Sequence, residues 1–115
     1  MPLGAMEIVL GPNAEAALLS LDRSNEKTAA SVARRVRALR GILLADCLHG
    51  EVVPKDRIPS VLQEAHGLEN LYVEDLPSFW RLLYTIVRDE GKRYIVVVEI
   101  ANHKTYSRWF PGRGH

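Results

Sequence analysis

The strongest constraint on the fold is a pair of nearly continuous apolar runs, residues 79–87 and 93–101, separated by Asp89-Glu90-Gly91. Runs of this length, rich in branched and aromatic residues, predict strands, and a short connection containing glycine predicts an antiparallel hairpin. A three-residue loop that ends on Gly91 sets the register of the two strands. In that register one face consists of the apolar pairs Trp80–Ile100, Leu82–Val98, Tyr84–Val96 and Ile86–Tyr94. We expect this face to pack on helices.

The opposite face of the predicted hairpin is mixed. The same register places Arg81 across from Glu99, between apolar neighbours. Two interpretations are open: a structural ion pair with Glu99, or a free functional guanidinium. Both hold if the ion pair orients the guanidinium.

The N-terminal half predicts a strand followed by two helices. Residues 7–10 form an apolar run that Gly11-Pro12 ends, and Asn13 can cap a helix after it. Ser24 can cap a second, longer helix to about Leu44. Its apolar stripe contains Val32, Val36, Leu39 and Leu43, and Arg34, Arg35, Arg37 and Arg40 lie off that stripe. The short break between the helices predicts an antiparallel helical hairpin.

The middle of the chain predicts connections around one more strand. Residues 50–59 read as a loop, and residues 59–66 as a short helix ended by Gly67. Residues 71–73 begin a strand, and residues 75–78 form a turn. We therefore expect one α+β domain over residues 1–115, with an N-terminal strand and a helical hairpin packed on a twisted antiparallel sheet of about four strands.

Composition and charge indicate the cellular location of the chain and the kinds of site that it can hold. Cys47 is the only cysteine, so it cannot form an internal disulfide, and a cytoplasmic location is expected. No run is long enough to span a membrane, no signal peptide is predicted, and Met6 is an alternative start. Residues 81–115 carry seven Lys/Arg against three Asp/Glu, which is either a patch for an anion or a solvated surface. Cys47, His49, His66 and His115 lack metal-ligand spacing, so no metal or other cofactor is expected.

Three segments resemble a known family, the RelE/ParE toxins. Trp80-Arg81-Leu82-Leu83-Tyr84 looks like the family's strand in which an arginine is functional, and Arg81 holds that place. His103-Lys104 is similar to the basic pair that ends the family's closing strand. Residues 50–55 resemble the loop after the helical hairpin, where members often place basic residues.

This resemblance implies the toxin of a type II toxin–antitoxin system, which cleaves mRNA, free or on the ribosome, without a metal. Its partner would be a cognate antitoxin, and a homodimer or a toxin–antitoxin hetero-oligomer is expected. RNA cleavage needs a base, an acid and cations that neutralise the phosphorane. The candidate catalytic residues are Arg81, His103, Lys104 and Tyr106, and the candidate RNA-binding residues are Lys55, Arg57, Arg108 and Trp109.

Each candidate also has a structural interpretation. His103 can cap a helix or form hydrogen bonds, and Tyr106, Trp109 and Phe110 can pack a final helical turn. The basic residues can simply be solvated, and the arginines of the second helix form either a wet face or an antitoxin contact. Phe110 stands where RNA-cutting members often have a tyrosine, so a non-catalytic toxin that inhibits DNA gyrase is the alternative function. A plain nucleic-acid-binding domain is a third.

Overall fold

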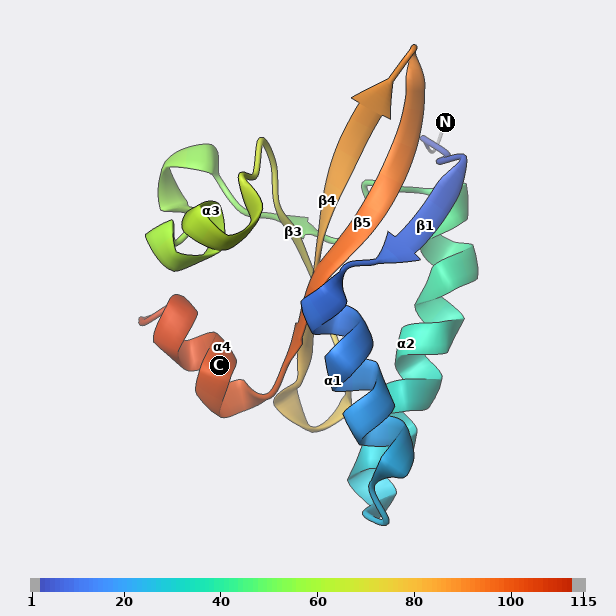
Figure 1. The fold of residues 1–115 in the computed structure, drawn as a ribbon, viewed down its shortest axis with the longest axis vertical. Helices are drawn as coiled ribbons and strands as arrows, with labels where there is room; N and C mark the ends of the chain where they lie inside the picture. The colour runs from blue at the N-terminus through green and yellow to red at the C-terminus, as the bar shows by residue number, and fades with distance from the viewer. Residues whose placement is uncertain (1–2, 113–115) are drawn as a thin grey trace.

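The computed structural model describes residues 3–112; Met1, Pro2 and residues 113–115, among them His115, lie outside the described residues. One sheet has helices on both of its faces (Figure 1). The elements in chain order are β1 (Glu7–Leu10), α1 (Pro12–Arg23), α2 (Lys27–Ala45), β2 (Glu51–Val52), the 3₁₀ turn η1 (Lys55–Arg57), α3 (Ser60–His66), β3 (Tyr72–Asp75), the 3₁₀ turn η2 (Pro77–Phe79), β4 (Arg81–Asp89), β5 (Lys92–Ala101) and α4 (His103–Trp109). The predicted α+β class and the helical hairpin are confirmed.

The sheet has five strands within the described residues, in the order β1-β5-β4-β3-β2. The pair β1–β5 is parallel, whereas the pairs β2–β3, β3–β4 and β4–β5 are antiparallel, so the sheet is mixed rather than wholly antiparallel. An antiparallel sheet of about four strands was expected. The additional strand is the short β2. It lies within residues 50–59, which were predicted to be a loop, and it pairs with β3.

The predicted register of the β4–β5 hairpin is wrong. Glu90 and Gly91 both have positive φ, 52° and 79°, and Asp89 pairs with Lys92, so the turn has two residues rather than three. Two such residues fit the tight turn whose twist matches the flanking strands. Further along, Leu83 faces Glu99 while Tyr84 faces Val97, which leaves one extra residue in β5 as a bulge.

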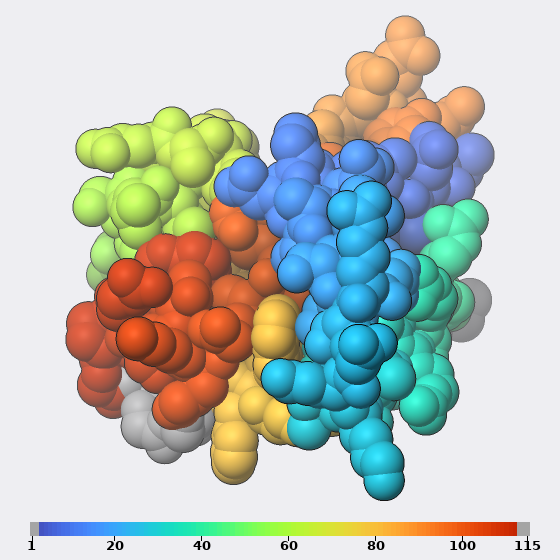
Figure 2. All heavy atoms as spheres, turned by 60° about the horizontal axis from the view of Figure 1, so that its bottom comes forward, coloured from blue at the N-terminus to red at the C-terminus, as the bar shows by residue number. Residues whose placement is uncertain are grey.

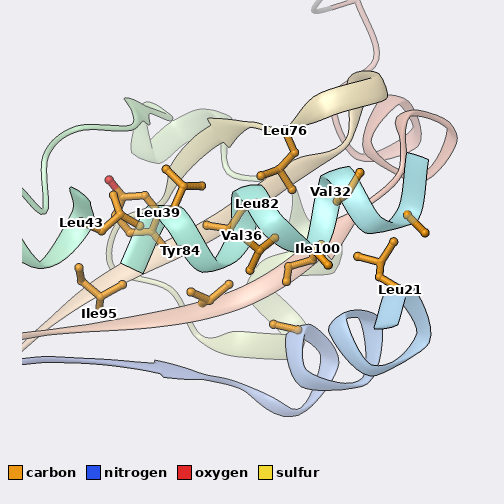
Figure 3. Close-up of a cluster of buried hydrophobic side chains, with 14 of the residues drawn as sticks. Leu21, Val32, Val36, Leu39, Leu43, Leu76, Leu82, Tyr84, Ile95 and Ile100 are labelled. Carbon is orange, nitrogen blue, oxygen red and sulfur yellow. The ribbon is translucent and has the colours of Figure 1, made fainter. Parts of the chain in front are cut away.

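The two-residue turn and the bulge together decide which side chains of β5 meet the helical hairpin. One core lies between the sheet and α1 and α2, and on the sheet side it contains Leu82, Tyr84, Ile95, Val97 and Ile100 (Figure 3). Val96 and Val98 were predicted on this face, but they pack in the core on the opposite face. The inward side of β4 was predicted correctly at Leu82 and Tyr84, because no extra residue interrupts that strand.

A second core covers the other face of the sheet. It joins α3, α4 and the loop before α3 to the sheet through apolar residues, which include Leu62, Leu83, Val98, Tyr106 and Phe110. Figure 1 shows α3 and α4 on one side of the sheet and α1 and α2 on the other. The predicted packing of a final helical turn by Tyr106 and Phe110 is confirmed.

The helix ends differ in detail from the prediction. Gly11 is the N-cap of α1, and Asn13 instead lies in the first turn, where its amide donates to Glu99 at 2.8 Å. The Ser24 hydroxyl accepts a hydrogen bond from Glu26, which is the N-cap of α2. Gly67 ends α3 at φ 60°, as expected for a left-handed C-cap.

An exposed ion pair connects the two helices of the hairpin. Nη2 of Arg37 in α2 lies 2.6 Å from Oδ2 of Asp22 in α1. The hydrogen bond from Arg37 lowers the pKa of the Asp22 carboxyl. Both side chains are solvated, so this pair contributes little to stability.

Gly50 occupies a position that has no space for a side chain. Its N–H donates to the Tyr84 hydroxyl at 3.0 Å, and a Cβ there would lie 2.9 Å from that hydroxyl and 3.0 Å from the Val73 carbonyl oxygen. We expect Gly50→Ala to lower the free energy of unfolding by about 1–3 kcal/mol, because overpacking would displace the tyrosine. Urea denaturation measures this change. Gly41→Ala is the matched control. A Cβ added there would meet no atom within 4 Å apart from its chain neighbours and the backbone of its own helix, so stability should rise slightly. An equal loss in both variants would contradict the steric explanation.

Tyr84 makes the folded protein less stable at alkaline pH. Its ring is fully buried and its hydroxyl donates to the Cys47 carbonyl at 2.8 Å. Burial raises the pKa of Tyr84 well above that of an unfolded tyrosine. The folded state therefore keeps a proton that the unfolded state loses, and stability falls as the pH rises above about 10.

We expect Tyr84→Phe to lower the free energy of unfolding by about 1–3 kcal/mol at neutral pH, because it leaves the Cys47 carbonyl and the Gly50 N–H unpaired. Its stability should then fall less steeply than the wild type's between pH 9 and 11 (about one unit on each side of the free tyrosine pKa), measured by urea denaturation; equal slopes would contradict the role of Tyr84.

Candidate functional site

Several candidate residues lie together at one end of the sheet, where β3 ends, β4 begins and β5 ends. Asp75 ends β3 opposite Arg81, which begins β4, and Arg81 in turn lies opposite Ala101, which ends β5. Helix α4 begins at His103, and only Asn102 separates it from the end of β5. Because neighbouring strands lie about 4.8 Å apart, residues from all three strands and from α4 share this sheet end.

Arg81 is a buried cation at the centre of this sheet end. Only 5% of the residue is exposed, and its guanidinium carbon lies 5.0 Å from the centroid of the Tyr106 ring. Its Nε lies 3.0 Å from Oδ1 of Asp75, and Nη1 donates to the Trp80 carbonyl at 3.1 Å. The resemblance implied an arginine open to phosphate, whereas this guanidinium is covered and connects β3, β4 and α4.

The predicted ion pair between Arg81 and Glu99 is wrong. Glu99 lies opposite Leu83, and its Oε2 is 2.8 Å from Nε2 of His66 and accepts from Asn13. Glu99 therefore connects α1 and α3 to β5. The register error explains the difference, because Arg81 faces Ala101.

Helix α4 has one buried and one exposed face. Asn102 caps it by accepting a hydrogen bond from the Thr105 N–H at 2.9 Å, so His103 is not the cap. Tyr106 is buried, and Phe110, four residues later, stacks on it with the ring centroids 4.8 Å apart. Lys104 and Arg108 are also four residues apart, and both are exposed. Two cations thus share the outer face of the helix.

His103 is exposed at the start of α4, and its ring lies beside Phe79. The two ring centroids are 5.7 Å apart and the planes are tilted by 57°. Figure 2 shows α4 next to the connection between β3 and β4 on one face of the molecule. His103 and Phe79 therefore form an exposed ring contact, and Lys104 is exposed next to His103 in the chain.

Phe79 is a site residue that the sequence did not indicate. It was predicted as the first residue of a strand, but it belongs to η2, where Ser78 and Phe79 have φ of 59° and 63°. Asp75 was likewise read only as a turn residue. Its place beside Arg81 follows from the register between β3 and β4, for which the sequence carried no clear signal.

Two of the four predicted RNA-binding residues come together beyond α4. Arg57 and Trp109 line one hollow with Phe110, Pro111 and Gly112. Arg108 is exposed on α4, and its Nη2 lies 3.5 Å from the Thr105 hydroxyl. Lys55 is paired elsewhere, with Nζ 3.1 Å from Oε2 of Glu69 on the exposed surface. Thus Arg57 and Trp109 share a hollow at the end of α4, Arg108 lies on the exposed surface of that helix, and Lys55 pairs with Glu69.

Two other kinds of feature were considered, a metal site and a membrane-spanning helix. Within residues 3–112 no group of three His, Cys, Asp or Glu side chains is arranged to hold a metal ion, and no helix there is long and apolar enough to cross a membrane. Comparison of the chain with protein-family models, curated proteins and solved structures finds no match.

Proposed function

We propose that this protein is the toxin of a type II toxin–antitoxin system and cleaves mRNA in the cytoplasm without a metal. The observation that carries the proposal is the exposed His103 at the start of α4, beside Lys104 and at the end of a central strand pair. An imidazole and an amine on one helical turn supply a proton-transfer group and a cation to an RNA phosphate.

The chemistry requires two proton transfers. An imidazole can act as a general base, so His103 can take the proton from a ribose 2′-hydroxyl. The 2′-oxygen then attacks the adjacent phosphorus, and the bond to the 5′-oxygen breaks. The Lys104 ammonium neutralises charge on the phosphorane and can pass a proton to the leaving 5′-oxygen. The products are a 2′,3′-cyclic phosphate and a 5′-hydroxyl.

Arg81 and Tyr106 act in this proposal through position. Their burial leaves little surface for RNA, but their contact ties α4 to β4. The same contact orients the first turn of α4, where His103 and Lys104 lie.

The rest of α4 offers a path for the RNA backbone. Lys104 and Arg108 share the exposed face, and Arg57 and Trp109 line the hollow at the far end. A helix of this length spans roughly 10 Å, enough for one or two nucleotides. We expect the cations to bind flanking phosphates and Trp109 to contact a base.

The order of the elements supports assignment to a toxin. A first strand, a helical hairpin and an antiparallel meander follow one another in the chain, which is the arrangement that the resemblance implies. In this function the partner is an antitoxin that covers the basic surface or the helical hairpin.

The test is expression of the protein alone, with mapping of transcript ends, followed by incubation of the purified protein with mRNA and EDTA, with and without ribosomes. Growth arrest together with EDTA-resistant cuts that leave cyclic phosphate ends supports the proposal. Intact RNA under all of these conditions would overturn it.

Inhibition of DNA gyrase by a non-catalytic toxin is the second candidate. The observation that favours it is the pairing of Arg81 with Asp75, which leaves the guanidinium largely neutralised. Growth arrest with intact RNA and blocked supercoiling would establish this function. Salt-sensitive nucleic-acid binding without growth arrest would instead indicate a plain binding domain.

A further inference from the structure

We propose that Phe79 is a stacking platform for an unpaired nucleobase of single-stranded RNA, placed beside His103. This inference rests on the proposed function, because it identifies how the same site would hold its substrate. It follows from the backbone of η2, the exposure of the ring and the side chains around it.

The backbone at Phe79 is strained. Ser78 and Phe79 are consecutive residues with left-handed φ, a conformation that glycine adopts without cost and that bulky side chains rarely adopt. The flanking residues hold the segment in place. Leu76 is buried, its N–H donates to the Trp80 carbonyl at 2.9 Å, and Trp80 packs against the core of the helical hairpin. Strain that the surroundings maintain is typical of functional segments.

The strained backbone at Phe79 does not bury the side chain of this residue. Phe79 is 63% exposed, more than any other large apolar side chain of residues 3–112. Its neighbours Leu76 and Trp80 turn inward, whereas its ring meets His103 on the surface. Core packing therefore does not explain why a phenylalanine occupies this position.

The surroundings of the ring fit a nucleotide. A base on Phe79 would have its ribose and phosphate close to His103, where the proposed proton transfer takes place. Lys104 follows His103 and is exposed, so a cation is available for the phosphate. A phenyl ring has no hydrogen-bonding group, so the platform would accept any base and favour those that stack strongly.

The experiment measures binding of an uncleavable single-stranded RNA. Its riboses carry 2′-O-methyl groups, and a 2-aminopurine base reports stacking by fluorescence quenching. Phe79→Gly should weaken affinity by about 5- to 150-fold, the range for loss of one stacked base. Phe79→Trp should retain both affinity and quenching. Leu19→Ala, which changes an exposed apolar residue of α1, should bind as the wild type does.

A second measurement separates stacking from misfolding. Glycine accepts the left-handed backbone, so Phe79→Gly should raise the thermal unfolding midpoint while it weakens RNA binding. Wild-type affinity in Phe79→Gly, absence of quenching, or equal loss in Leu19→Ala would overturn the proposal. So would relief of growth arrest by Phe79→Gly with unchanged RNA affinity, which would assign Phe79 to a protein contact. Quenched, Phe79-dependent binding by a protein that cuts no RNA would support the platform while the nuclease function failed.

Discussion

Replacing His103 with alanine should slow RNA cleavage by about 10²- to 10⁴-fold, the contribution of one general acid or base, and should abolish growth arrest. The side chain is exposed, and Asn102 rather than His103 caps α4. The variant should therefore fold as the wild type does. Single-turnover cleavage of a labelled RNA measures the rate, and urea denaturation checks stability.

Two controls make the His103 result specific. Added imidazole should restore part of the cleavage rate in His103→Ala, because a free base can enter an exposed site, whereas it should not accelerate the wild type. Arg88→Ala changes an exposed residue of β4 outside the site and should cleave normally. Cleavage by His103→Ala at the wild-type rate would remove His103 from the mechanism.

Arg81→Ala should destabilise the protein by about 2–5 kcal/mol and abolish cleavage. The cost is that of truncating a large buried side chain, since its stem packs in the sheet and its guanidinium lies over Tyr106. The remaining partner, Asp75, is 85% exposed in its side chain, so no buried charge is left behind. Urea denaturation and the cleavage rate are the two measurements.

Arg81→Met separates packing from charge. Methionine is long, flexible and able to contact an aromatic ring, so it should recover most of the stability lost in Arg81→Ala. If Arg81 acts only by positioning α4, Arg81→Met should also recover much of the cleavage. A stable Arg81→Met protein that cannot cleave would show that the charge itself acts on the RNA. Unchanged stability in Arg81→Ala would contradict the structural role.

The periodicity of the chain was enough to predict most elements. The stripe from Val32 to Leu43 indicated the long helix, and Gly67 marked the end of the short one. The alternation in β4 correctly assigned Leu82 and Tyr84 to the helical face. These features depend on neighbouring residues along the chain, so they can be read locally.

The pairing of the strands could not be read in this way. Glu90 is an ordinary residue in a left-handed conformation, and the two-residue turn that it forms with Gly91 shifts the register by one residue, which puts Val96 and Val98 on the other face. Turn type and bulge position depend on hydrogen bonds between two strands and on their twist. A shift of one residue moves side chains to the opposite face. At Arg81 the turn and the bulge each add one residue, so its partner is Ala101 rather than the predicted Glu99.

The same distinction between local patterns and contacts between distant segments applies to the candidate site. Resemblance to a family indicated Arg81, His103 and Lys104, but it could not show that the arginine is buried between Asp75 and Tyr106. Nor does any local pattern predict a phenylalanine with left-handed φ beside a histidine more than twenty residues away in the chain. The sequence by itself determined which segments form helices and strands, because local periodicity encodes them. Only the tertiary structure decided register, burial and partners at the site, because these depend on contacts between segments that are distant in the chain.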